Sequence, residues 1–282
     1  MTSAQKALTI LFFILSSFSL QANEVIKLSD VTTEISLGTK VEVFEDTNHA
    51  LTIADIQGNS KNISWHRNQS NTPSLGYSNS TYWFRLSIHN DLPEASEHLI
   101  EVGYSMLNEL DYFVLEDGAL REHQTSGNLH PYSQRDIAHR NFLFDVDILP
   151  GNQVDIYLRV KSNSSIQVPI TLSPTHIFYS NDQTELISKS LYYGMMLVMI
   201  LYNLFLLISL KEIVYFYYIS FVFSVTAAQF CLHGLSSQYF WPETPSLQEY
   251  SILLFVPCCV LFAALFTRQF LHLKHNSPNT DK

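Results

Sequence analysis

The hydrophobic pattern of the chain changes character near residue 186. Before that point, short apolar segments alternate with polar ones and are separated by turn-forming residues. After it, three long apolar runs contain no charged side chain, and a helix needs about 20 such residues to cross a membrane. The pattern therefore predicts a polar domain followed by three membrane helices. The expected bounds are 23–185 for the domain and about 190–210, 213–232 and 251–271 for the helices.

Alternation with a period of two predicts about eight or nine β-strands in the polar domain. The clearest strand is 81–90, whose one face carries Tyr82, Phe84, Leu86 and Ile88. Further strands are expected at 25–28, 39–44, 61–64, 98–104, 110–115, 141–148, 153–160 and 166–172. The segment 50–58 fits the β pattern least well and leaves a short helix open as the alternative. Many short strands with turns between them are typical of a sandwich or jelly roll. The expected fold class is a mainly β jelly-roll sandwich followed by transmembrane α-helices.

The N-terminus has the layout of a secretory signal peptide, expected at residues 1–22. Lys6 precedes an apolar core at 7–15, and a small, polar flank permits cleavage after Ala22. An uncleaved signal anchor is the alternative, although the apolar core is short for a membrane span. The domain that follows is therefore expected on the outer side of a membrane.

Basic residues beside the apolar runs indicate how the chain is oriented. Lys211 lies in the short turn between the first two runs, and Arg268 lies at the end of the third. Lys and Arg favour the cytoplasmic side of a membrane, so the turn at Lys211 and the end of the third run at Arg268 are expected in the cytoplasm. The polar tail at 276–282 then lies in the cytoplasm.

Charge and cysteine content exclude several classes of function. The formal net charge is −10, whereas a nucleic-acid partner needs a basic face. The three cysteines all lie in predicted membrane helices, so the polar domain is expected to hold no disulfide and no cysteine-ligated metal. The sequence also has no Gly-rich phosphate loop, no His-Glu-x-x-His pattern and no Gly-x-Ser-x-Gly elbow. No feature favours an enzyme.

Several segments, in order along the chain, resemble one bacterial receptor family. They are YWFRLSI at 82–88, PYSQRDIAHRNFLF at 131–144, LYYGMMLVMILYNLFLLISL at 191–210 and GLSSQYFWP at 234–242. The first two are similar to the type-2 extracellular domain of the seven-transmembrane receptors with diverse intracellular signalling modules (7TMR-DISM). The last two resemble the start of the membrane domain of that family. The resemblance covers roughly residues 25–275.

The resemblance implies a periplasmic sensor domain similar to carbohydrate-binding modules, in a dimeric receptor of the bacterial inner membrane. Relatives have seven helices and often carry a cytoplasmic diguanylate cyclase or histidine kinase. This sequence reaches Lys282 after three apolar runs, without the other four helices or an output module. We therefore expect a fragment, a truncated gene product or a naturally short relative.

Polar and aromatic residues near 131–144 suggest a ligand site. Aromatic rings pack against sugar rings, and forked donors bind hydroxyls or carboxylates. The candidate ligand-binding residues are Tyr104, Asn108, Tyr132, Arg135, His139 and Arg140. In this hypothesis both arginines orient a polar or acidic ligand, so replacing either with alanine weakens binding at an almost unchanged melting temperature. The alternative is structural, with Arg140 paired to a buried carboxylate and Tyr104 in the core.

Trp65 and Trp83 are further aromatic candidates, and calcium is a second ligand to consider. No cofactor is expected, but calcium binds carboxylate and carbonyl oxygens. The acidic residues available for it are Asp111, Glu116, Asp117, Asp145 and Asp147, which lack EF-hand spacing. Taken together, the sequence predicts a non-enzymatic membrane receptor whose outer domain binds a small ligand or glycan. The alternative is a membrane-anchored domain that binds a partner protein.

Overall fold

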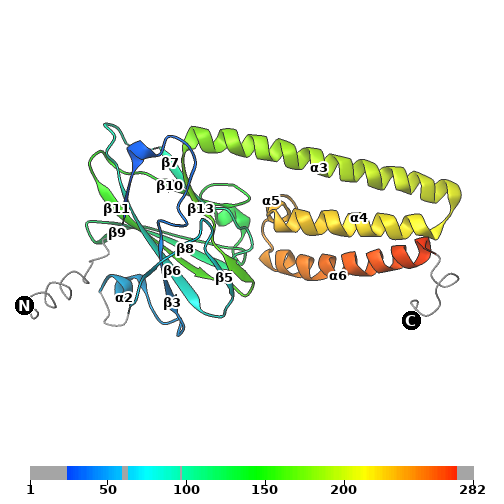
Figure 1. Ribbon diagram of the computed structural model, residues 1–282, viewed down its shortest axis with the longest axis horizontal. Helices are drawn as coiled ribbons and strands as arrows, with labels where there is room; N and C mark the ends of the chain where they lie inside the picture. Colours follow the sequence, from blue (N-terminus) through cyan, green and yellow to red (C-terminus); the bar gives the residue numbers. More distant parts are fainter. Residues whose placement is uncertain (1–23, 59–62, 96, 272–282) are drawn as a thin grey trace, which may run out of the picture.

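The computed structural model describes residues 24–58, 63–95 and 97–271. A β-sandwich is followed directly by three long helices that extend away from it (Figure 1). The expected fold class, a mainly β domain followed by apolar helices, is confirmed. The expected signal peptide, the polar tail at 276–282 and part of the expected strand 61–64 lie outside the described residues.

Two sheets form the sandwich. The larger has the order β4 (His66–Arg67), β3 (Glu42–Asp46), β6 (Thr81–His89), β11 (Gln153–Lys161), β8 (Glu109–Glu116) and β9 (Ala119–Ser126), with β1 (Val25–Lys27) parallel to β6. The smaller has the order β10 (Phe142–Val146), β7 (His98–Val102), β13 (Ile170–Pro174) and β2 (Ile35–Ser36). A separate pair joins β5 (Ser74–Tyr77) to β12 (Ser165–Gln167). Strands β9 and β10 are therefore edge strands of opposite sheets.

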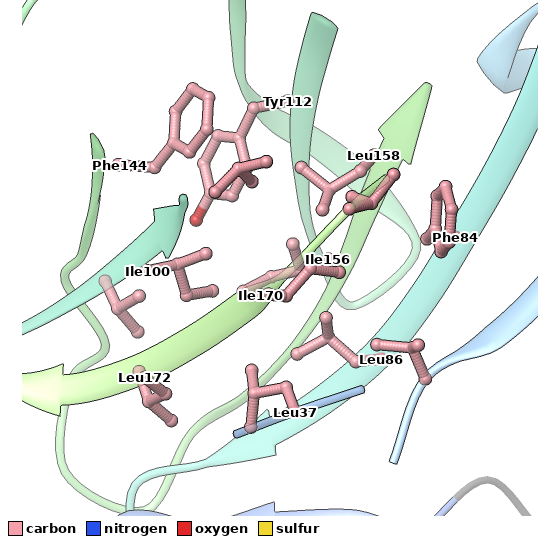
Figure 2. Packing of buried hydrophobic residues seen from close by; sticks show 14 of the residues in the cluster. Leu37, Phe84, Leu86, Ile100, Tyr112, Phe144, Ile156, Leu158, Ile170 and Leu172 are labelled. Carbon is pink, nitrogen blue, oxygen red and sulfur yellow. The ribbon is translucent and has the colours of Figure 1, made fainter. Parts of the chain in front are cut away.

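The main core lies between the two sheets, where the predicted alternation places apolar side chains (Figure 2). Phe84 and Leu86 of β6 are fully buried there. Tyr112 of the larger sheet stacks on Phe144 of the smaller one, with 4.3 Å between ring centroids. Burying one large apolar side chain stabilises a fold by about 1.5–3 kcal/mol, so this interface holds the sandwich together.

The larger sheet is also buried on part of its other face. Trp83, which alternates away from the main core, packs in a second cluster with Ile56, Phe113 and Leu115. Ile56 comes from α2 (Ile53–Gln57), whose first turn is capped by Thr52. The short helix left open as the alternative within 50–58 is thus confirmed. Because Trp83 is fully buried, it is a packing residue and offers no exposed platform.

The described residues contain thirteen strands, more than the eight or nine expected. The sequence missed β2, β4 and β5, which are short, and β9, whose sequence ALREHQTS is mostly polar. Residues 63 and 64, the described part of the expected strand 61–64, are not in a strand. The expected strand 166–172 is divided into β12 and β13 near Pro169. Proline lacks the backbone N–H that a continuous ladder requires, which explains the break.

The first long helix begins earlier than the hydropathy pattern indicates. Helix α3 (Thr175–Leu210) starts immediately after β13, whereas the membrane span was expected from about residue 190. It is followed by α4 (Ile213–Leu232), α5 (Leu235–Tyr239) and α6 (Pro245–Phe270). Among the described residues, α3, α4 and α6 are long and apolar enough to cross a membrane.

The early start of α3 joins the sandwich directly to the first membrane span. Its 36 residues extend for about 54 Å at 1.5 Å per residue, which exceeds the ~30 Å hydrocarbon core. The first turns therefore lie outside the span, where Phe178 packs against Leu99 and Leu143 of the smaller sheet. No loop separates β13 from α3, and the helix packs directly on the sandwich.

Candidate functional site

A small cavity of about 190 Å³ lies at the open side of the sandwich, where the edge strands β9 and β10 face each other. Its walls are residues 123–126 of β9, residues 142–144 of β10, and residues 134–137 of the connection between them. The volume is below the ~300–1,000 Å³ of sites for drug-sized molecules, so the cavity suits a single small ligand. Most of the side chains from β9 are polar, and Phe142 supplies an aromatic ring.

Arg135 is the predicted site residue that lines this cavity. Its Nη1 donates to the carbonyls of His139 at 2.7 Å and Arg140 at 3.2 Å. The guanidinium carbon lies 4.6 Å from the ring centroid of Phe142 and 5.1 Å from that of Tyr132. Its Nε is buried and has no hydrogen-bond partner among the described residues. Burial lowers the pKa of Arg135 to about 10, so the side chain remains charged at neutral pH.

His139 and Arg140 face away from the cavity, toward α3. Arg140 is only 3% exposed, and its Nη2 lies 2.6 Å from Asp182 and 2.8 Å from Glu185 on the outer turns of the helix. Lys189 continues the network by pairing with Glu185 at 2.6 Å. This arrangement matches the structural alternative for Arg140. It ties residues 131–140, hereafter the junction loop, to the first membrane helix.

His139 adds a second contact from the junction loop to α3. The backbone N–H of Asn141 donates to Nδ1 of His139 at 3.1 Å, which leaves the proton of the neutral ring on Nε2. Nε2 lies 3.0 Å from Asp182, to which it donates. Burial lowers the pKa of His139, because its neutral form is favoured away from water.

The other end of the junction loop contacts the outer ends of the later helices. The backbone N–H of Tyr132 donates to the carbonyl of Pro242 at 2.7 Å, and Ser133 Oγ donates to Glu243 at 3.0 Å. Gly234, just after α4, has a φ of +71°, and a Cβ there would lie 2.7 Å from the carbonyl oxygen of Arg140. A glycine is required for this close approach. The junction loop thus contacts the ends of α3, α4 and α6.

Tyr104 and Asn108, also predicted as site residues, do not line the cavity. Tyr104 packs against the main core, as the structural alternative proposed. Asn108 is buried, and its Oδ1 accepts from Ser162 Oγ at 3.0 Å and from the backbone N–H of Asn163 at 2.7 Å. Its carbonyl accepts from Leu129 at 3.1 Å, which holds the start of the β9–β10 connection. Both residues shape the sandwich near the site.

Trp65 and the acidic calcium candidates have other partners. Trp65 lies beneath the guanidinium of Arg85, whose carbon is 4.4 Å from the ring centroid. Asp111 accepts from Thr125 at 2.7 Å and pairs with Arg159 at 2.9 Å. Among the described residues, no group of three or more His, Cys, Asp or Glu side chains is arranged to hold a metal ion.

Sequence reasoning missed two sets of residues at this site. The cavity wall from β9 was missed because that strand is polar and has no apolar alternation. Asp182 and Glu185 were missed as partners because they were assigned to the end of the sandwich domain. Their spacing of three, followed by Lys189 four residues later, is a helical signal that places all three on one face.

Comparison with known proteins identifies the two parts of the chain separately. The family model "7TMR-DISM extracellular 2" matches residues 38–174, and "7TM diverse intracellular signalling" matches residues 185–281. No curated protein matches the chain.

Among solved structures, a β-glucuronidase from Ruminococcus gnavus in complex with a C6-substituted uronic isofagomine is similar over 51% of this chain and 30% of its own, with 9% identity and a TM-score of 0.31. The α-xylosidase Xac1773 from Xanthomonas citri is similar over 47% of this chain and 13% of its own, with 14% identity and a TM-score of 0.24. This chain therefore spans less than a third of either enzyme. The likeness is too distant to bear on function.

Proposed function

Because this chain belongs to the family of seven-transmembrane receptors with diverse intracellular signalling modules, we propose that its outer sandwich binds a small carbohydrate or carbohydrate derivative. The bound state is relayed through the helices to a cytoplasmic output module. The described sandwich and helices carry out no chemistry of their own in this scheme. The receptor acts as a homodimer in the bacterial inner membrane, with the sandwich in the periplasm and the end of α6 toward the cytoplasm.

The observation that carries this proposal is that one loop serves both the cavity and the helices. Arg135 lines the cavity, and its Nη1 binds the carbonyls of His139 and Arg140. The side chains of those two residues bind α3 through Asp182. A ligand that binds Arg135 therefore affects the backbone at residues 139 and 140, and this backbone positions the contacts with α3.

The proposed ligand class follows from the cavity wall. Hydroxyl and amide side chains from β9 can exchange hydrogen bonds with sugar hydroxyls. Phe142 lies behind Arg135, whose guanidinium carbon is 4.6 Å from the ring centroid, so this buried ring supports the arginine that faces the ligand. The edges of β9 and β10 add backbone donors and acceptors, because an edge strand leaves part of its ladder unpaired.

The proposed orientation is supported by the ends of the helices. Lys211 lies between α3 and α4, and Arg268 lies in the last turn of α6, both at the ends away from the sandwich (Figure 1). Trp241 and its aromatic neighbours lie in the connection that meets the sandwich. Basic residues on one side and aromatic residues at the interface fit the positive-inside rule and the aromatic belt.

A ligand shifts the helices only if it binds one arrangement more tightly than another. In the proposed mechanism, the junction loop has a different position in each of the two arrangements, and the ligand binds one position more tightly than the other. Since this loop contacts the ends of α3, α4 and α6, a change in its position alters how those ends are held together. The output module then responds to the arrangement of the helices.

The test is thermal unfolding of the full chain in detergent micelles, with a panel of neutral and acidic monosaccharides. Ligand at 100 times its dissociation constant stabilises by about 2.7 kcal/mol, which raises the midpoint by several degrees. L-Glucose is the matched control for D-glucose, because it has the same composition and the opposite handedness. Amide exchange of residues 175–189, which do not line the cavity, reports whether binding reaches α3.

A saturable shift with one sugar, together with changed exchange in α3, supports a relaying receptor. A shift without any change in α3 leaves a binding domain and contradicts the relay. No shift with any sugar contradicts the carbohydrate class and favours the alternative of a partner protein.

A further inference from the structure

Arg135 differs from every other arginine of the sandwich in its partners. The described part of the sandwich, residues 24–174, contains six arginines, and five of them pair with a carboxylate. The five pairs are Arg67 with Glu24, Arg85 with Glu42, Arg121 with Glu116, Arg140 with Asp182 and Glu185, and Arg159 with Asp111. Arg135 has no carboxylate within ion-pair distance among the described residues. The fold thus neutralises its arginines with one exception, and that exception lines the cavity.

The surroundings of Arg135 make it energetically unfavourable to leave its charge without a carboxylate partner. Its Nη1 has only carbonyl acceptors, its Nε has no acceptor among the described residues, and two aromatic rings cover the guanidinium. A charge removed from water is destabilising unless it is paired and hydrogen-bonded. A carboxylate is the group that matches a guanidinium fork in both charge and geometry. The free protein therefore holds a cation whose natural counter-ion is absent from its own described residues.

The rest of the cavity limits what else the ligand can carry. Asp136 also lines the cavity, is exposed, and lies next to Arg135 in the chain. A carboxylate at this position accepts hydrogen bonds from hydroxyls and repels a second negative charge. Apart from His123, which lies 3.2 Å from Asp111, the remaining polar wall, such as Gln124 and Gln134, consists of uncharged donors and acceptors. The walls suit one carboxylate joined to several hydroxyl groups.

We propose that the ligand of this cavity is a monocarboxylate of the sugar-acid class, a uronate, whose carboxylate pairs with Arg135. This inference rests on the proposed function, in which the same cavity binds a carbohydrate derivative, and it names the chemical class. The pairing supplies the counter-ion that the other five arginines obtain from the protein. The pairing also involves the side chain whose Nη1 binds the carbonyls of His139 and Arg140. In this proposal, Arg135 both recognises the carboxylate and transmits binding to α3.

The experiment is calorimetric titration of the full chain in detergent with pairs of sugars that differ only in the carboxylate. The pairs are D-glucuronate with D-glucose and D-galacturonate with D-galactose, and methyl D-glucuronate serves as the neutral ester. One acid should bind at least about tenfold more tightly than its neutral partner, as expected for a hydrogen-bonded charge pair. This comparison needs no variant, so it decides the question even if substitutions at Arg135 prevent folding.

Variants assign the preference to a residue. Arg135→Gln should reduce affinity for the acid by about tenfold while changing affinity for the neutral partner little. Arg135→Lys keeps the charge, loses the fork and should give an intermediate affinity. Arg121→Gln is the matched control, because Arg121 lies on β9, pairs with Glu116 and does not line the cavity. It should leave both affinities unchanged.

The outcomes separate this inference from the proposed function. Equal binding of acids and neutral sugars overturns the inference and leaves the carbohydrate proposal intact. Propionate is included as a monocarboxylate that is not a sugar, with propionamide as its neutral partner. Binding of propionate that depends on Arg135, without binding of any sugar, overturns the uronate inference and contradicts the carbohydrate class. No binding by any of these probes contradicts both.

Discussion

The junction loop carries two arginines in opposite circumstances, one at its end and one in its middle. Arg140 is 3% exposed and lies between two carboxylates of α3. Arg135, five positions earlier, has carbonyl acceptors and aromatic rings around it but no carboxylate among the described residues. One arginine therefore completes a contact inside the protein, and the other leaves a charge available beside a cavity. The sequence PYSQRDIAHR does not distinguish them, because the difference comes from what the fold brings to each.

This comparison separates anchoring from recognition within a single loop. Arg140 fixes the loop to the first membrane helix, and Arg135 lies beside the cavity in which we propose that a ligand binds. Because the Nη1 of Arg135 binds the carbonyl of Arg140, neither residue can move without affecting the other. The comparison holds only if substitutions at the two arginines have very different effects on stability.

The largest expected effect is from Arg140→Met. Methionine retains the apolar stem but leaves Asp182 partly buried without its cation, and breaking a buried ion pair costs about 3–5 kcal/mol. Glu185 is more exposed and keeps Lys189, so the lower end, about 3 kcal/mol, is expected. The midpoint of thermal unfolding in detergent, followed by tryptophan fluorescence, should fall by on the order of 10 °C. The sequence alone left two outcomes open for this position, namely an unchanged melting temperature if Arg140 binds a ligand and a loss of stability if it pairs with a buried carboxylate.

Arg121→Met is the control for that substitution. Arg121 pairs with Glu116 at 3.4 Å on the surface of the sandwich and donates to the carbonyl of Asp147 at 2.6 Å. An exposed pair of this kind contributes about 0–1 kcal/mol, so the midpoint should change little. Equal losses for the two variants would mean that the contact between Arg140 and α3 has no special role.

A smaller effect is expected on the helix side, from Asp182→Asn. The amide keeps the size of the side chain but removes the charge that faces Arg140 and His139. A hydrogen bond to a charged group contributes about 1.5–3 kcal/mol, and we expect a loss of about 2 kcal/mol in the free energy of unfolding. Glu185→Gln is the matched control, since its side chain is 53% exposed and should contribute less than about 1 kcal/mol. A larger loss of stability for Glu185→Gln than for Asp182→Asn would show that the more buried carboxylate does not contribute more to stability.

The same anchor should weaken in acid because of His139. Burial lowers the pKa of His139 in the folded protein relative to an unfolded value near 6.5. The folded state therefore favours the neutral ring, and this stabilisation is fully present above the unfolded pKa. It is lost as the pH falls from about 6.5 toward the lower folded pKa. Unfolding midpoints measured between pH 8 and pH 5 should fall less steeply for His139→Gln than for the wild type, and equal slopes would contradict this assignment.

Much of the fold could be predicted because burial leaves a local signature. The alternation in β6 and the uncharged runs of α4 and α6 reflect constant surroundings along each element, namely a core or a bilayer. Strand β9 was not predicted because its residues face solvent and the cavity, so no periodic apolar pattern is required. The early start of α3 was missed because its first turns rest on the sandwich and contain polar residues.

The candidate site was predicted only as a set of side chains that belong near one another. The sequence placed Arg135, His139 and Arg140 together because they are close in the chain, but their partners lie on other elements. Asp182 comes from α3, and the cavity wall from β9. Contacts between residues far apart in the sequence determine which arginine is paired with a carboxylate, and no local sequence pattern predicts those contacts.

The smallest effect on stability is expected from Arg135→Gln without ligand. Glutamine can still donate to a loop carbonyl, and removal of a poorly compensated charge offsets the other lost hydrogen bond, so the free energy of unfolding should change by less than about 1 kcal/mol. The midpoint should stay within a few degrees of the wild type, in the same detergent assay that shows a large loss for Arg140→Met. A loss as large as that of Arg140→Met would make Arg135 a second anchor. In that case Arg135 would have a structural role, and the ligand would have to be recognised elsewhere on the sandwich.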